Sequence, residues 1–180
     1  MPRLIINADD LGLTPGVNRA ILEAHQRGVV TSTTLMANSA AFDDAVGHVR
    51  QAPRLSVGCH VMLVDGEPLL EPRPRTLARN GRFRDGIAGF ALTAMRGRLD
   101  PNEIAAEATA QMRRLQSAGV SVSHLDTHKH THLFPSVLRP LLEAAKGCGV
   151  RAVRNPFAPV APLALAHLVK RPRLWTRYSE

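Results

Sequence analysis

Strand-like and helix-like segments alternate along this chain, and that alternation restricts its fold more than any other feature. Short runs rich in apolar and β-branched residues, typical of buried strands, are separated by amphipathic segments with helix start and stop signals. This order predicts an α/β fold in which parallel strands form a sheet or barrel with right-handed crossovers. We expect strands at 3–8, 29–36, 55–61, 120–126 and 150–153, and helices at 14–28, 40–52, 101–119 and 135–146.

The first expected helix shows these local signals most clearly. Thr14 occupies the N-cap position, Pro15 follows at the first helical position, and Gly28 stands where a C-terminal glycine belongs. Apolar residues then repeat at a spacing of three to four, which predicts one face packed on the sheet. The residues of that face are Val17, Ala20, Ile21 and Ala24.

Two stretches do not follow the alternation. Residues 65–89 are rich in proline and arginine without periodicity, and loops of this length in compact domains often serve as lids or binding loops. The formal net charge of +8 arises mainly near the C-terminus. We interpret 155–180 as a basic segment that is solvated or pairs with acids elsewhere, with peripheral contact to an anionic membrane as the alternative. Nucleic-acid binding is disfavoured, because only 4% of the residues are aromatic and few bases could stack on them.

The cysteines and the apolar runs bear on the compartment. Cys59 and Cys148 are far apart and form no C-x-x-C motif, so neither a disulfide framework nor a thiolate zinc site is indicated. The apolar stretch before Asp9 is too short for a signal peptide, and no run approaches the roughly 20 apolar residues that span a bilayer. These features predict a soluble cytoplasmic protein, with any contact at the inner membrane face being peripheral.

Polar side chains cluster where three of the expected strands end. Asn7, Asp9 and Asp10 come first, His60 closes the third strand, and the segment 124–132 holds four of the eight histidines. Each cluster alone has a plainer explanation: an acidic turn, a core histidine or an adventitious metal-binding loop. Their joint placement favours a functional site, because the carboxyl ends of parallel strands carry the chemistry in such folds. Two imidazoles and a carboxylate suit a divalent ion and leave coordination positions open for water and substrate.

These motifs resemble the YdjC-like carbohydrate deacetylases, and within them the branch associated with hopanoid biosynthesis. The resemblance rests on LIINADDLGLTPGVNRAILEAHQRGVVTSTTLMAN at 4–38, VGCH at 57–60 and SHLDTHKHTHLFP at 123–135, and it extends to about Arg154. It implies a distorted (β/α) barrel, similar to a TIM barrel. It also implies a hydrolase that removes N-acetyl groups from a sugar or glycolipid-type substrate with one divalent metal ion.

The resemblance also assigns roles to individual residues. Asp10, His60 and His128 match the family's metal ligands, and Asp9 resembles the acid that acts as base toward the attacking water. Asp126 is a candidate for the carboxylate that orients a ligating imidazole, with a plain structural hydrogen bond as the alternative. Other candidates for contacts around the metal or to the substrate are Asn7, His124, His130 and His132.

The expected chemistry is hydrolysis of an amide. The metal lowers the pKa of its water, polarises the acetyl carbonyl and stabilises the oxyanion, while Asp9 accepts a proton. Histidine ligands favour zinc, whereas the resemblance implies magnesium, so both ions stay open. Two residues depart from the family pattern: Leu11 replaces a phenylalanine, and Lys129 interrupts a run of three histidines. Lys129 places a charge beside the site, which favours a different substrate unless the side chain points away.

Chain length is the largest departure. Family members continue well past residue 180, through further βα units and a late histidine motif that supplies a catalytic acid. The resemblance therefore implies that 1–180 is a single barrel domain that is incomplete at its C-terminus, and we expect it alone to aggregate or oligomerise and to show little activity. The alternatives are a catalytically incomplete fragment that binds metal or sugar, and another metal hydrolase on a similar barrel.

Overall fold

The parallel sheet predicted from the alternating segments is present in the computed structural model, which describes residues 4–156. Its strands lie in the order β1-β2-β3-β6, and every neighbouring pair is parallel. The α/β class is therefore confirmed, whereas closure of the sheet into a barrel stays a prediction. The strands are β1 (Asn7–Leu11), β2 (Ser32–Leu35), β3 (Ser56–Val61) and β6 (Val122–Thr127).

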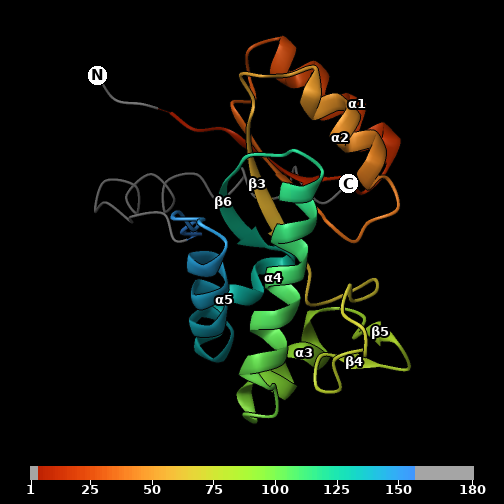
Figure 1. Ribbon diagram of the computed structural model, residues 1–180, viewed down its shortest axis with the longest axis vertical. Coiled ribbons are helices and arrows are strands. Elements are labelled where there is room, and N and C mark those ends of the chain that lie inside the picture. Colours follow the sequence, from red (N-terminus) through yellow and green to blue (C-terminus); the bar gives the residue numbers. More distant parts are fainter. Residues whose placement is uncertain (1–3, 157–180) are drawn as a thin grey trace, which may run out of the picture.

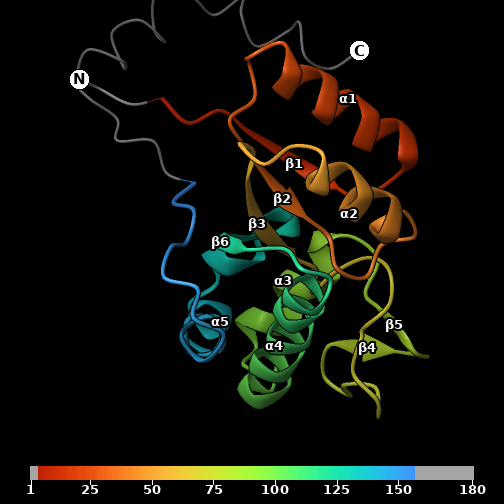
Figure 2. The same ribbon diagram turned by 45° about the horizontal axis from the view of Figure 1, so that its top comes forward.

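Helices follow these strands along the chain and bury their apolar faces in a core that they share with the sheet. Thr14 and Asp100 cap two of the helices, each by accepting a hydrogen bond from a main-chain N–H of the first turn. α1 and α2 lie side by side, and α4 packs along α5 (Figures 1 and 2). The bounds are α1 (Pro15–Gln26), α2 (Phe42–Arg50), α4 (Pro101–Ser117) and α5 (Pro135–Gly147).

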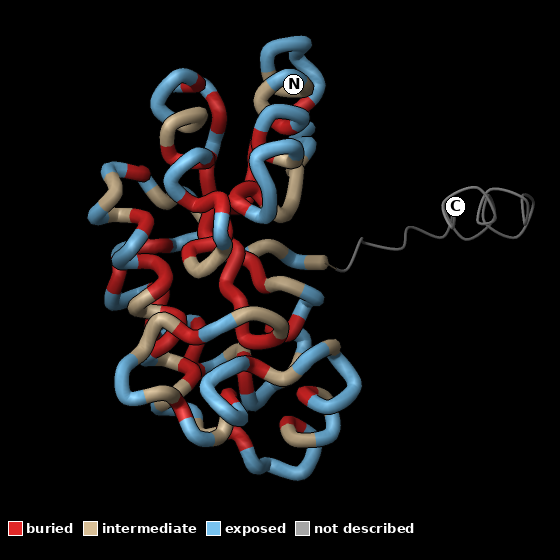
Figure 3. Tube along the Cα trace, turned by 90° about the vertical axis from the view of Figure 1, so that its right-hand side faces the viewer, coloured by how far each residue is buried: buried red, intermediate tan, exposed pale blue. Residues whose placement is uncertain are grey.

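The core lies between the sheet and the inward faces of these helices. Buried stretches follow the strands and alternate with exposed turns along the helices (Figure 3). α4 contributes a fully buried apolar stripe at a spacing of three to four residues, which is the pattern of an amphipathic helix. The stripe consists of Ile104, Ala108, Met112 and Leu115.

Two predicted strands differ most from the structure in extent. The first begins at Asn7 rather than residue 3, and Leu4 and Ile5 are 78% and 75% exposed. The physical reason is that β1 has only β2 beside it among the described residues, so the apolar run preceding it has nothing to pack against. The fifth predicted strand is reduced to an isolated bridge between Leu125 and Val153.

The segment 65–89 has more structure than its sequence indicates. It holds a short hairpin of β4 (Ala78–Arg79) and β5 (Arg82–Phe83), and α3 (Ile87–Met95) begins within it. No helix was predicted there. Its role as a lid or binding loop stays a prediction.

Three polar side chains of α4 fix the chain before and within this segment. They recur every four residues on one face of the helix, and we call them the α4 polar stripe: Glu103, Glu107 and Gln111. Glu103 accepts hydrogen bonds from the main-chain N–H groups of Arg75 and Thr76, each at 2.8 Å. Glu107 accepts from those of Leu69 and Leu70, and Gln111 pairs with both main-chain groups of Met62. These hydrogen bonds anchor the backbone of the segment 65–89, which we call the insertion.

Within residues 4–156, no helix combines the length and the apolar character that a membrane span requires. The basic segment predicted at 155–180 lies almost entirely outside the described residues. Its contact with a membrane surface stays a prediction.

Candidate metal centre

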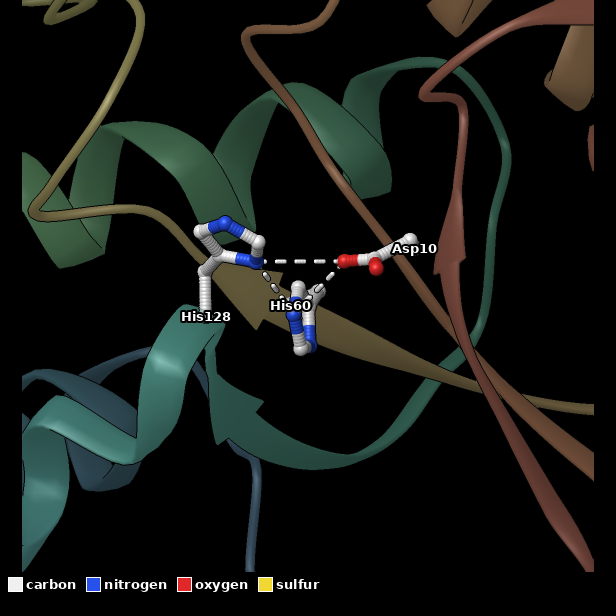
Figure 4. A group of neighbouring side chains, drawn as sticks. All are labelled: Asp10, His60 and His128. Atoms are coloured by element: carbon white, nitrogen blue, oxygen red, sulfur yellow. Dashed lines mark hydrogen bonds and ion pairs between the residues drawn. The ribbon is translucent and has the colours of Figure 1, made fainter. Parts of the chain in front are cut away.

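Three side chains from separate parts of the chain meet at the carboxyl edge of the sheet (Figure 4). Asp10 lies near the end of β1, and His60 lies near the end of β3. His128 begins a 3₁₀ segment, η1 (His128–Leu133), directly after β6. The structure thus brings together the three predicted metal ligands, and their common position follows from the parallel order of their strands.

The ligand atoms form a nearly equilateral triangle. Asp10 Oδ1 lies 3.1 Å from His128 Nδ1 and 3.2 Å from His60 Nε2, and the two imidazole nitrogens are 3.3 Å apart. Metal–ligand bonds of about 2.0–2.2 Å separate neighbouring ligand atoms by about 3.0 Å in an octahedron and about 3.4 Å in a tetrahedron. The observed sides fall between these values. The donor set therefore fits one divalent ion and leaves positions for water or substrate.

The electrostatics of the cluster favour a bound cation. Hydrogen bonds from His128 and His60 hold the pKa of Asp10 well below its usual range. Burial opposes the charged form of His60, but its contacts with Asp10 and Asp126 outweigh this and raise its pKa to about 9. In the absence of an ion, a proton on an imidazole supplies the positive charge beside the carboxylate. A divalent ion would supply that charge with both imidazoles neutral.

A buried carboxylate stands behind His60. Asp126 is fully buried, and its Oδ1 lies 2.6 Å from His60 Nδ1, the ring nitrogen that faces away from the triangle. Thr34 Oγ1 lies 3.1 Å from the same nitrogen. This arrangement is the usual one for a ligating histidine, in which a carboxylate fixes the ring and its tautomer.

Arg154 joins two carboxylates of the site, and sequence reasoning missed it. Its Nη1 donates to Asp9 Oδ1 at 2.6 Å and to Asp126 Oδ2 at 3.1 Å. Asn7 Nδ2 also donates to Asp9 Oδ1, at 2.7 Å. Arg154 reaches the site because its main-chain N–H bonds to Leu125 O on β6. The sequence did not distinguish Arg154 from the other basic residues near the C-terminus, so no role was predicted for it.

Lys129 is paired with an acid that lies beside His128. Its Nζ lies 2.7 Å from Asp65 Oδ2, and His128 Nε2 lies 3.6 Å from the same oxygen. Partial burial opposes ionisation of Asp65, but Lys129 and the N–H of Gly86 outweigh it and lower its pKa. The extra charge expected beside the site is therefore balanced by an acid from the insertion.

The remaining predicted histidines do not join the triangle. His124 lies across β3, 2.8 Å from Ser123 Oγ, and a Cβ on Gly58 would come within 2.6 Å of its ring. Burial lowers the pKa of His132, whose Nδ1 lies 2.6 Å from Thr127 Oγ1. His130 is exposed, and its ring centroid lies 6.0 Å from that of His132 in an edge-to-face arrangement.

Asn18 supports the turn after Asp10 and was also missed. It is buried on α1, where the apolar pattern predicted Ala20, which is exposed. Its Oδ1 accepts from the N–H of Gly12 at 2.7 Å, and its Nδ2 donates to Ala41 O and Asp44 Oδ2. Gly12 itself has φ of +96° and leaves no room for a Cβ, which would lie 2.7 Å from Ser39 Oγ.

Fold and site together define an α/β protein with a candidate three-ligand metal centre at the carboxyl edge of a parallel sheet. Comparison with known families adds the second step. The family model described as YdjC-like protein matches residues 3–178, and the chain belongs to this family.

Relatives and solved structures agree with this assignment. The chain is 42% identical over 155 residues to the carbohydrate deacetylase of Brevibacillus brevis, covering 86% of this chain and 60% of the relative. It is 44% identical over 126 residues to carbohydrate deacetylase 1 of Listeria innocua, covering 70% of this chain and 51% of the relative. The chain thus spans little more than half the length of these relatives.

A crystal structure of a putative cellobiose-phosphate cleavage protein from Enterococcus faecalis superimposes with a TM-score of 0.74 at 31% identity, covering 92% of this chain and 63% of that one. A lactam utilization protein from Thermus thermophilus gives a TM-score of 0.53 at 18% identity, covering 95% of this chain and 64% of that one. That second similarity concerns the fold alone.

Proposed function

We propose that this chain carries the metal-binding part of a carbohydrate deacetylase, which hydrolyses N-acetyl groups on a sugar or glycolipid-type substrate. The observation that carries the proposal is the triangle of Asp10, His60 and His128, whose sides of 3.1–3.3 Å suit one divalent ion. Its occurrence in a chain similar to proteins named carbohydrate deacetylase supports amide hydrolysis as the reaction. The imidazoles favour zinc over magnesium, and association with hopanoid biosynthesis and a cytoplasmic location stay predictions.

A divalent ion bound there would lower the pKa of a water ligand and polarise the acetyl carbonyl. Asp9 is assigned as the base that removes the proton from the attacking water. Because its Oδ1 already accepts hydrogen bonds from Arg154 and Asn7, we assign the incoming proton to Oδ2. Arg154 and Asn7 together fix the orientation of the Asp9 carboxylate through these hydrogen bonds.

The first test counts bound metal. We expect the wild-type chain to bind one Zn²⁺ ion, and His60→Ala and His128→Ala each to abolish that stoichiometric binding. His48→Ala is the matched control, because His48 lies on α2 and its Nε2 lies 3.6 Å from Asp44 Oδ2, a residue of the same helix outside the triangle. Equal metal content in the wild type and both ligand variants would contradict the site.

The second test measures acetate released from a panel of N-acetylated sugars, with the Brevibacillus brevis relative as positive control. In an intact homologue, the substitution that corresponds to Asp9→Asn should keep the metal and lose turnover, whereas one that corresponds to Asp43→Asn, an exposed residue in the first turn of α2, should keep both. Loss of metal in Asp9→Asn with retention in Asp10→Asn would reverse the two roles.

A second candidate is a metal- or sugar-binding fragment without turnover. Stoichiometric metal binding with no acetate release from any sugar of the panel would select this candidate.

A further inference from the structure

Asp65 stands on the outer side of His128, as Asp126 stands behind His60. His128 faces the triangle with Nδ1, and its other ring nitrogen, Nε2, lies 3.6 Å from Asp65 Oδ2. We propose that Asp65 is a positioning residue for His128, and that its carboxylate keeps the proton on Nε2 so that Nδ1 presents a lone pair to the metal. The inference rests on the proposed function only in that His128 is taken as a ligand.

The contact acts through charge. A separation of 3.6 Å is too long for a hydrogen bond, but a carboxylate at that distance still favours a proton on the nitrogen that faces it. Ligating histidines commonly present their outer N–H to a carboxylate or carbonyl, which fixes both tautomer and ring orientation. With Asp65 included, each imidazole of the triangle has its own acid behind it.

The carboxylate of Asp65 is fixed from two sides. Lys129 Nζ lies 2.7 Å from its Oδ2, and the main-chain N–H of Gly86 donates to its Oδ1 at 2.9 Å. The main-chain N–H of Asp65 donates to Arg84 O at 3.0 Å, which joins the start of the insertion to a residue near its end. The carboxylate of Asp65 is therefore held in one orientation by these contacts.

Unusual backbone geometry concentrates at the same place. Four residues here have φ between 53° and 63°, a region that residues other than glycine rarely adopt: Asp10, Asp65, Lys129 and His130. Among the described residues only one further non-glycine residue, Asn80, has positive φ, and it lies in the turn of the β4–β5 hairpin. Such conformations persist where surrounding contacts enforce them, and they gather at functional sites. Asp65 and Lys129 both hold this geometry while facing each other.

The α4 polar stripe supplies the rigid support. Gln111 fixes the main chain at Met62 and Glu107 fixes it at Leu69 and Leu70, so Asp65 lies between two anchored points. A charge on an anchored segment can set the orientation of a ligand, whereas one on a mobile tip would average over many positions.

The main test is Asp65→Asn in the full 180-residue chain. Asparagine tolerates positive φ and keeps an oxygen for the N–H of Gly86, so the substitution removes the charge and leaves the local fold in place. We expect Zn²⁺ affinity to fall about 10–100-fold. We also expect a changed visible spectrum of the Co²⁺-loaded chain, since that spectrum reports ligand geometry. Glu67→Gln, the same charge change on the same segment at a residue paired with Arg82, should alter neither.

Lys129→Gln separates positioning from simple charge balance. In Asp65→Asn the uncompensated ammonium of Lys129 itself repels a divalent ion, so the effect of Asp65→Asn is measured again in the Lys129→Gln background. A loss of about tenfold or more in that background supports the positioning role. Equal Zn²⁺ affinity of Lys129→Gln and the double variant would overturn it, as would an unchanged Co²⁺ spectrum in Asp65→Asn. If the wild-type chain binds Zn²⁺ but releases no acetate, the proposed deacetylase function is contradicted and the role of Asp65 is not.

Discussion

Replacing Gln111 by leucine tests whether the α4 polar stripe holds the chain beyond β3. Gln111 is fully buried; its Oε1 accepts from Met62 N and its Nε2 donates to Met62 O, both at 2.8 Å. Leucine has a similar volume and leaves no room for water to replace the amide. Both main-chain groups of Met62, itself buried, would then lack partners.

These two groups set the minimum expected loss, because Gln111 Nε2 also donates to Glu107 Oε1 at 2.8 Å and leucine removes that hydrogen bond as well. Each buried main-chain group left without a partner costs about 1–3 kcal/mol, which gives about 2–6 kcal/mol for the pair. Burial of the leucine side chain offsets about 1.5–3 kcal/mol of this. A net destabilisation of about 2 kcal/mol is therefore expected, which lowers Tm by roughly 4–8 °C in a domain of this size.

Urea unfolding of the metal-free chain, followed by circular dichroism, measures this quantity. Gln26→Leu is the matched control: Gln26 is an exposed residue at the end of α1, and its change should stay within about 0.5 kcal/mol. A Gln111→Leu midpoint equal to or above that of the wild type would refute the reasoning, because the two main-chain groups would then be satisfied in some other way.

Three further predictions concern other parts of the molecule. Burial opposes ionisation of Glu103, but hydrogen bonds from Thr76 and Arg75 outweigh it and lower the pKa of Glu103 below 4.5. The ionised carboxylate therefore stabilises the fold above pH 4.5, and this stabilisation is lost as the pH falls through the pKa of the folded state. In urea unfolding, Glu103→Gln should therefore be destabilised at pH 6 and converge with the wild type in acid; a gap independent of pH would contradict this. Arg154→Met should lower the free energy of unfolding by about 1.5–3 kcal/mol in the same assay, because buried Asp126 loses a charged hydrogen-bond donor, and a change as small as that of a solvated arginine would argue against the bridge. Gly58→Ala should lower the unfolding midpoint through its clash with the ring of His124, and a second change, His124→Ala, should recover part of the loss; without recovery, the clash lies elsewhere.

Local patterns explain why much of the fold was predictable. Thr14 and Asp100 signal helix starts through their own side chains, and the apolar stripe of α4 needs only the helical period. The three polar clusters were recognisable because parallel strands bring their carboxyl ends to one edge, and the family resemblance then assigned Asp10, His60 and His128 within them. The helix starts, the apolar stripe and the clusters depend on neighbours in sequence or on one topological rule.

The missed features depend on partners distant in sequence. Arg154 and Asp9 are 145 residues apart, and nothing near Arg154 marks it as different from the other cations of that region. Asn18 sits on a buried helix face because it bonds to the turn after β1 and to Ala41, a pairing that apolar periodicity cannot show. The exposed Leu4 illustrates the reverse error, since an apolar run is buried only if another element covers it.

The spacing of the three ligands along the chain has a thermodynamic consequence. His60 and His128 are separated by 68 residues, and Asp10 and His128 by 118, so the donor set exists only when β1, β3 and β6 are already assembled. An ion that binds the folded chain alone, at 100 times its dissociation constant, adds about 2.7 kcal/mol to the free energy of unfolding. The triangle would then act as a reversible crosslink between the first and last strands of the sheet, and the supply of metal would set how tightly the sheet holds together.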